Sequence, residues 1–224
     1  MGGGGDMEIF LMAAALGAAL AVWCEERAAG RHRAFYLLKP ATTLLILGAV
    51  LTAPGADPDY RLWVAVAVLL STCGDIALMR HDDAGFLVGL GSFLLAHSVF
   101  VAAFLLDGVQ APPGWTAVPV TAGLVFLLWL LPRTGRLRLP VAVYAAALVA
   151  MSVAAAVRME IRDDRGAMLA AIGTLVFLLS DAALAIRRFH RPYPHAQAVI
   201  LSTYWSALGL IALSVAGGTA LAPA

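Results

Sequence analysis

The chain is poor in charge, lysine and cysteine. Charged residues make up 13% of its 224 residues, and the formal net charge is +1. It has no basic tail and no Lys/Arg cluster interleaved with aromatic residues, which excludes the usual electrostatic surface for a nucleic acid. Cys24 and Cys73 have no metal-binding spacing, and they indicate no disulfide framework.

Apolar residues, by contrast, are abundant. They make up 62% of the chain and raise its mean hydropathy to +0.87, values typical of a polytopic membrane protein. Eight apolar segments have roughly the length that a ~30 Å hydrocarbon layer requires. They are Met7–Trp23, Phe35–Leu51, Leu62–Met79, Gly85–Leu106, Trp115–Leu131, Leu139–Val157, Ala167–Ile186 and Ala196–Ala216. We expect an all-α fold, with residues 1–6 as a disordered lead and residues 7–217 as a single bundle of eight transmembrane helices.

The distribution of arginine predicts the orientation, because short loops rich in Lys and Arg stay in the cytoplasm. Most arginines fall in the loops after the first, third, fifth and seventh segments. The opposite side has only Arg61, Arg158, Arg162 and Arg165. Both termini are therefore predicted to face away from the cytoplasm, in a membrane that we take to be the bacterial inner membrane. The last three of these arginines disagree with the assignment.

Apart from Glu8 at the edge of the first segment, the acidic, basic and histidine side chains inside the apolar segments are Asp75, Asp181, His97 and Lys39, the only lysine. An unpaired carboxylate in hydrocarbon costs several kcal/mol, so such residues are rare outside functional sites. We count depth from the cytoplasmic helix ends at ~1.5 Å per residue. Six polar residues then fall roughly 6 to 18 Å deep. They are Lys39, Asp75, His97, Tyr144, Asp181 and Tyr204. We therefore expect a polar site in the cytoplasmic half of the bundle.

Each of these residues also has a purely structural interpretation. Asp75 and Lys39 can form an ion pair that joins two helices. Tyr144 and Tyr204 are also compatible with an aromatic belt at the membrane interface. His97 continues an apolar stripe at helical spacing, and this favours an interhelical hydrogen bond.

Several motifs together resemble the YhhN family of lysoplasmalogenases. Gly74-Asp75 is followed by Leu78-Met79, Ala96-His97 lies in the next segment, and Ser180-Asp181 is followed by Leu184-Ala185. Lys39-Pro40 and Tyr144 also fit, so the similarity extends from Lys39 to about Ile211. Phe100 and Leu208 depart from the family pattern, in which both positions are usually polar.

The resemblance implies hydrolysis of the vinyl ether bond of a lysoplasmalogen, with a lysophospholipid substrate taken from the bilayer and no cofactor or metal. Vinyl ether cleavage begins with protonation of a carbon and passes through an oxocarbenium ion. Our hypothesis is that one of Asp75 and Asp181 donates the proton while the other stays ionised and stabilises the cation. Lys39, His97, Tyr144, Tyr204 and Ser180 are the predicted supporting residues. The sequence does not assign the two aspartate roles, the headgroup or the oligomeric state.

Two other functions remain open at this point. A small-solute or proton-coupled carrier could use Asp75, Asp181 and Lys39 as a relay. Carriers of this kind often bind near the bilayer midplane on broken helices, whereas here the acidic pair lies toward one side and Pro40 is expected at a helix start. A metal-dependent lipid amidohydrolase would need more ligands than one intramembrane histidine and two aspartates provide.

Overall fold

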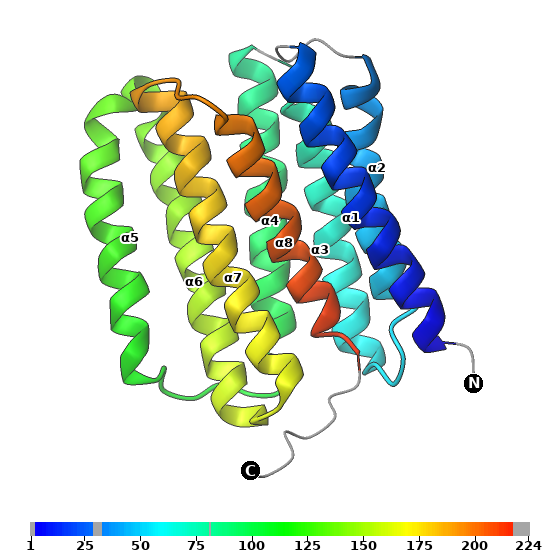
Figure 1. Ribbon diagram of the computed structural model, residues 1–224. Helices are drawn as coiled ribbons and strands as arrows, with labels where there is room; N and C mark the ends of the chain where they lie inside the picture. The colour runs from blue at the N-terminus through cyan, green and yellow to red at the C-terminus, as the bar shows by residue number, and fades with distance from the viewer. Residues whose placement is uncertain (1–2, 29–32, 81, 217–224) are drawn as a thin grey trace.

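The computed structural model describes residues 3–28, 33–80 and 82–216, which form eight long α-helices and no strand (Figure 1). The helices are α1 (Gly3–Ala28), α2 (Arg33–Leu51), α3 (Pro58–Ala77), α4 (Asp83–Phe104), α5 (Ala117–Leu130), α6 (Arg138–Arg162), α7 (Arg165–Ala185) and α8 (Ala196–Leu213). Short 3₁₀ turns flank α5 and precede α6, and a π-helical turn, Ile186–His190, continues α7. Eight helical segments of the described chain are long and apolar enough to cross a membrane. The predicted all-α, eight-helix architecture is confirmed.

Two predictions about helix starts are wrong. α1 begins at Gly3, so residues 3–6 form its first turn instead of a disordered lead. The helical hydrogen bonds extend outward from the apolar segment, and the carboxylate of Asp6 in the first turn favours this end through the helix dipole. Pro40 lies inside α2, not at its start, because the helix begins at Arg33. The ends of the predicted ranges, residues 1, 2 and 217, lie outside the described part of the chain.

Aspartate side chains define the starts of three helices. Each accepts a hydrogen bond from the backbone N–H three residues further on, which satisfies an amide that the helix leaves free. The three are Asp57 before α3, Asp82 before α4 and Asp164 before α7. Asp163 has a φ of 45°, and this left-handed conformation reverses the chain between α6 and α7 within two residues. These local signals fix where α3, α4 and α7 begin and where the chain turns between α6 and α7.

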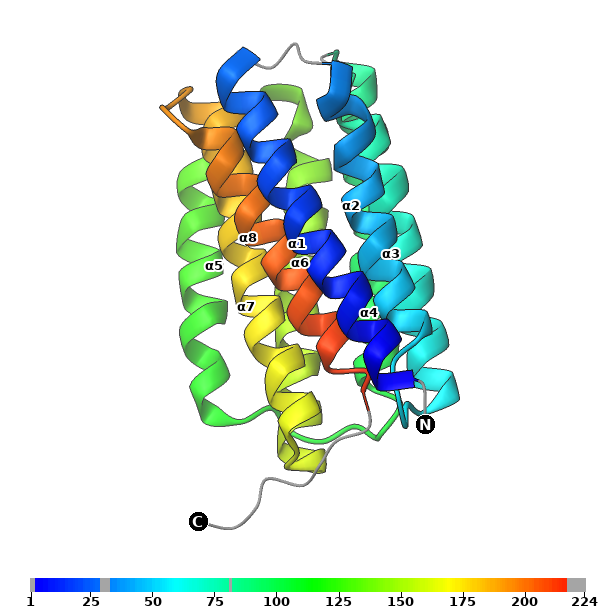
Figure 2. The same ribbon diagram turned by 45° about the vertical axis from the view of Figure 1, so that its right-hand side comes forward.

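The helices alternate in direction, so that α1 begins and α8 ends at the same end of the bundle (Figures 1 and 2). We call this the terminal end. Consecutive helices pack closely in the pairs α1–α2, α3–α4 and α7–α8, and α8 also contacts α1, α2 and α3. α5 stands at the edge of the bundle, where it packs mainly on α6 (Figure 1). The central helices α3 and α8 are therefore the best placed to enclose a polar site.

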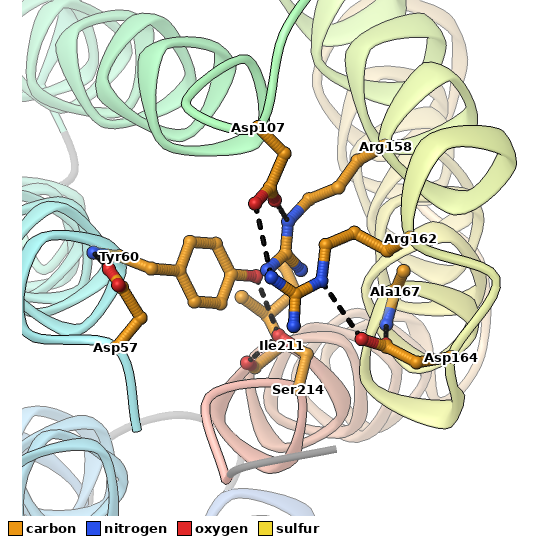
Figure 3. Close-up of polar contacts among 9 residues, drawn as sticks. All are labelled: Asp57, Tyr60, Asp107, Arg158, Arg162, Asp164, Ala167, Ile211 and Ser214. Atoms are coloured by element: carbon orange, nitrogen blue, oxygen red, sulfur yellow. Dashed lines mark hydrogen bonds and ion pairs between the residues drawn. The ribbon is translucent and has the colours of Figure 1, made fainter. Parts of the chain in front are cut away.

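An ion-pair cluster ties α4, α6 and α7 together at the terminal end (Figure 3). Arg158 donates from Nε to Oδ2 of Asp107 at 2.8 Å, and Arg162 contacts both Asp107 and Asp164 at 3.2 and 2.9 Å. The guanidinium of Arg158 also lies 3.7 Å from the centre of the Tyr60 ring. Two of the three arginines that disagree with the predicted orientation are therefore paired with carboxylates, so neither is an isolated positive loop charge.

Candidate functional site

Asp75, near the end of α3, is the centre of a buried hydrogen-bond network. Its side chain is 1% exposed. The Lys39 ammonium lies 3.3 Å from Oδ1, while the hydroxyls of Thr43 and Tyr204 donate to Oδ2 at 2.7 and 2.9 Å. The carboxyl group thus receives donors from α2 and α8. Three donors around one carboxyl stabilise its ionised form, and the adjacent ammonium balances the charge.

Close helix packing places this carboxyl group. Gly74 faces the Phe93 ring of α4, and a Cβ at Gly74 would lie 2.6 Å from Cε2 of that ring. Any larger residue would therefore push α3 away from α4. This contact gives a physical reason for the Gly-Asp pair noted in the sequence.

Thr43 was not predicted as a site residue. Besides binding Asp75, its hydroxyl oxygen accepts a hydrogen bond from the indole Nε1 of Trp205 at 3.2 Å. Thr43 lies four residues after Lys39, which places both side chains on the same face of α2. This spacing was visible in the sequence and could have identified Thr43.

Asp181, in the last turn of α7, has a different environment. Its side chain is half-buried, and Oδ2 accepts one hydrogen bond, from the hydroxyl of Tyr144 on α6, at 2.5 Å. The neighbouring Ser180 is buried and donates to the backbone carbonyl of Ile200 at 3.0 Å. Ser180 therefore fastens α7 to α8 directly beside Asp181.

Both aspartates line one cavity of about 340 Å³ at the end of the bundle opposite the terminal end. Lys39, Ser180 and Tyr204 line it too. The two carboxyl groups share this space but have separate hydrogen-bond partners among the described residues. The structure thus brings six of the seven predicted site residues to one region, five of them on the cavity wall and Tyr144 through its bond to Asp181.

Charged residues at the helix ends also line the cavity, and we call them the cavity mouth. They are Glu25, Arg80, Asp82, Arg187 and Arg188. Arg80 donates to Asp82 at 2.7 Å, and this bond together with the backbone N–H of Gly85 lowers the pKa of the Asp82 carboxyl. The mouth therefore carries fixed charges of both signs, which suits a polar or zwitterionic group.

His97 is the predicted site residue that does not reach the cavity wall. It is fully buried between two aromatic rings, with ring centroids 5.2 Å from Tyr144 and 4.9 Å from Phe177. Neither ring nitrogen has a hydrogen-bond partner among the described residues. The structure assigns His97 a packing position behind Tyr144, and its role as a polar supporting residue stays a prediction.

A second, apolar pocket adjoins the polar cavity between α4, α5, α6 and α7. Its walls are almost entirely hydrocarbon, and among the described residues only Tyr144 and Asp181 supply hydrogen-bonding side chains. Leu78, Phe86 and Phe93 line both spaces, as does Asp181. The half-buried aspartate is therefore at the boundary between a polar and an apolar space.

Potential metal ligands are sparse in the described part of the chain. No three His, Cys, Asp or Glu side chains lie close enough there to hold an ion together. What the site residues offer instead is proton transfer and charge stabilisation by two carboxyls and two phenols.

These features define an integral membrane protein with two aspartate carboxyl groups in a cavity between its helices. A model of the YhhN family matches residues 34–215, and the chain belongs to this family. It is 36% identical over 183 residues to lysoplasmalogenase TMEM86B of Sus scrofa, covering 80% of this chain and 75% of the relative. Lysoplasmalogenase TMEM86A of Homo sapiens is 32% identical over 75% of this chain and 69% of its own length. A lysoplasmalogenase of Mycobacterium bovis is 35% identical over 68% of this chain and 60% of its own. No solved structure matches the chain.

Proposed function

We propose that this protein hydrolyses the vinyl ether bond of lysoplasmalogens, with a fatty aldehyde and a glycerophospho-base as products. Its membership of the YhhN family and its similarity to enzymes named lysoplasmalogenase support this substrate class. The observation that carries the proposal is that Asp75 and Asp181 line one cavity with separate sets of donors. One carboxyl group can then hold a proton while the other is ionised, as paired carboxyls in glycosidases do.

The reaction requires one proton donor, one negative charge and water. The acid transfers its proton to the vinyl carbon that is not bonded to oxygen, and the π electrons form the new C–H bond. The adjacent oxocarbenium ion is stabilised by the ionised carboxyl group. Water adds to the cationic carbon and releases a proton to a carboxylate. The hemiacetal hydroxyl then gives its proton to the carboxylate as the C–O bond to the glycerol oxygen breaks, and this leaving oxygen takes a proton from the carboxylic acid. The two carboxyl groups again share one proton, and one water is consumed.

Lys39 has a defined role in this scheme. It lies 3.3 Å from Asp75, which supports a role as the counter-ion of this carboxyl group. The arginines at the mouth, Arg80, Arg187 and Arg188, are placed to meet the substrate phosphate.

The cavity mouth, in this proposal, faces the cytoplasm, and both termini lie on the other side of a bacterial inner membrane. The loop arginines support this orientation, since Arg80, Arg187 and Arg188 are at the mouth. Arg158 and Arg162, at the terminal end, are paired with Asp107 and Asp164, so they oppose the assignment less than their number suggests.

The experiment is an assay of the purified protein in detergent or proteoliposomes, with a lysoplasmenylcholine and its alkyl-ether analogue as substrates. Aldehyde is expected from the vinyl ether only. Asp75→Asn and Asp181→Asn are each expected to lower turnover at least about a hundredfold, the usual contribution of a positioned acid or base. Asp59→Asn, an exposed carboxyl at the terminal end, is the control. Absence of aldehyde from the folded wild-type protein would refute the proposal.

A further inference from the structure

The hydrolysis scheme gives no role to the apolar pocket beside Asp181. We infer that this pocket holds the alkenyl chain of the substrate, and that Asp181 is consequently the residue that protonates the vinyl carbon. The inference rests on the proposed function and assigns to the two aspartates the roles that it leaves open.

The two adjoining spaces match the two parts of the substrate. A lysoplasmalogen has a polar glycerophosphate part and one hydrocarbon chain, and the vinyl ether is the junction between them. The polar cavity and the apolar pocket also meet at a junction, formed by residues that line both. These are Leu78, Phe86, Phe93, Asp181 and Leu184. Asp181 is the only one of them that can transfer a proton. A lipid with its headgroup in the cavity and its chain in the pocket places its vinyl ether beside this carboxyl group.

The wall of the apolar pocket suits a hydrocarbon chain. Side chains such as Leu90, Leu127 and Leu148 form its surface, and Asp181 is the one charged group of the described chain that lines it. A polar substrate would lose hydrogen bonds with water in such a pocket without replacement, whereas a hydrocarbon chain loses none. α5 packs mainly on α6 at the edge of the bundle (Figure 1). A chain therefore has a lateral route from the bilayer that need not cross the core.

The two carboxyl groups differ in exposure and in their hydrogen-bond partners. Asp75 is 1% exposed, and its oxygens are occupied by Lys39, Thr43 and Tyr204. Asp181 is half-buried, has one donor, and faces both spaces. A general acid must approach within hydrogen-bond reach of the atom that it protonates. Only Asp181 is free to do so, while the donors around Asp75 hold that carboxyl group in place as the ionised partner.

The Tyr144 hydroxyl completes this assignment. When Asp181 gives up its proton to carbon, the resulting carboxylate keeps the hydrogen bond from Tyr144 at Oδ2. The bond is then charge-assisted and stronger than before transfer. Tyr144 therefore stabilises the product of the protonation step more than its starting state, as a transition-state interaction must.

The test compares two neighbouring alanines of α6. Ala145 lines the apolar pocket, whereas Ala146 is exposed and lines neither that pocket nor the polar cavity. Ala145→Leu shortens the pocket, so kcat/KM for a hexadecenyl substrate should fall about tenfold or more, the usual effect of a few methylenes in an apolar site. The kcat/KM for an octenyl substrate should fall much less. Ala146→Leu should leave the ratio of the two substrates unchanged. Activity on the short chain shows that the variant is folded.

Two results would overturn the inference. One is an Ala145→Leu variant whose ratio of long-chain to short-chain kcat/KM equals that of the wild type. The other is an Asp181→Asn variant that releases aldehyde faster than Asp75→Asn, since the residue that touches the carbon must be the more essential. Both leave hydrolysis by the wild type intact, so they are distinct from failure of the proposed function, in which the wild type itself forms no aldehyde.

Discussion

Tyr144 and Asp181 are joined by a hydrogen bond of 2.5 Å between the consecutive helices α6 and α7. The phenol oxygen donates to Oδ2, and the Tyr144 ring packs edge-on against buried His97. The position of Asp181 therefore depends on α6 and α4 as well as on α7. Several measurable consequences follow from this bond and from the networks around it.

Tyr144→Phe removes the donor and keeps the ring. A hydrogen bond to a charged group contributes about 1.5 to 3 kcal/mol, so kcat should fall roughly ten- to hundredfold with little change in thermal stability. Aldehyde release measures the effect. Tyr193→Phe, which removes a phenol outside the cavity, should stay close to the wild type. Full activity in Tyr144→Phe would show that the bond has no part in the reaction.

Lys39→Met should destabilise the fold more than the same change at an exposed lysine would. It leaves the Asp75 carboxyl group buried without its counter-ion, and breaking a buried pair on one side costs about 3 to 5 kcal/mol. The double variant Lys39→Met/Asp75→Asn should recover much of this loss, because no buried charge remains. Thermal unfolding in detergent, read as a double-mutant cycle, measures the coupling. Additive effects would mean that the two groups do not interact.

Arg158→Leu tests the cluster at the terminal end (Figure 3). Arg158 pairs with Asp107 at 2.8 Å and covers the Tyr60 ring, so its loss should lower the unfolding free energy by about 3 kcal/mol. Arg158→Lys should not restore stability, because an ammonium cannot reproduce a planar guanidinium that stacks and pairs at once. Turnover per folded molecule should be unchanged, since the cavity that Asp75 and Asp181 line is at the other end of the bundle. A selective loss of turnover would contradict this separation.

The cap of α7 predicts a pH dependence of stability. Partial burial opposes ionisation of Asp164, but hydrogen bonds from the Ala167 amide and Arg162 outweigh it and lower the pKa of this carboxyl below 3.8. The folded state therefore binds fewer protons than the unfolded state, so this stabilisation is present at neutral pH and is lost as the pH falls below about 5. Asp164→Asn keeps a capping oxygen but cannot titrate. Its melting temperature should decline less steeply than that of the wild type between about pH 5 and pH 3. Parallel curves would assign the acid sensitivity to other groups.

Membrane orientation can be tested with single cysteines. In a Cys24→Ala/Cys73→Ala background, Pro112→Cys lies in the exposed α4–α5 connection, and Arg191→Cys lies in the exposed connection before α8 at the opposite end. With an impermeant maleimide on intact cells, we expect labelling of the first and labelling of the second only after permeabilisation. The reverse pattern would invert the proposed topology.

Much of the fold was predictable because a bilayer restricts what a sequence can do. A segment that is long and apolar enough to cross hydrocarbon has to satisfy its own backbone, and only a helix does so within one segment. Helix starts were less predictable, as residues 3–6 and Pro40 show, because hydrogen bonding extends beyond the apolar residues. The shared region of Asp75 and Asp181 followed from their similar depth.

Other parts of the site depend on how the helices pack. The sequence places Thr43 on the same face of α2 as Lys39, but it does not show that the Thr43 hydroxyl joins Asp75 to Trp205 of α8. His97 shows the opposite case, since a lone histidine in an apolar helix suggests a hydrogen bond, yet it packs between aromatic rings. Hydrogen-bond partners depend on how helices rotate and approach one another, which is information that a single segment does not contain.

The sequence by itself determined the class of protein, the number of helices and the ionisable residues that the membrane makes conspicuous, because the free energy of placing a group in hydrocarbon depends mainly on the group. Only the tertiary structure decided which carboxyl group is saturated with donors and which faces an apolar pocket. That difference between Asp75 and Asp181 arises from packing between α2, α3, α6, α7 and α8, and packing is a property of surfaces that meet only when the chain is folded.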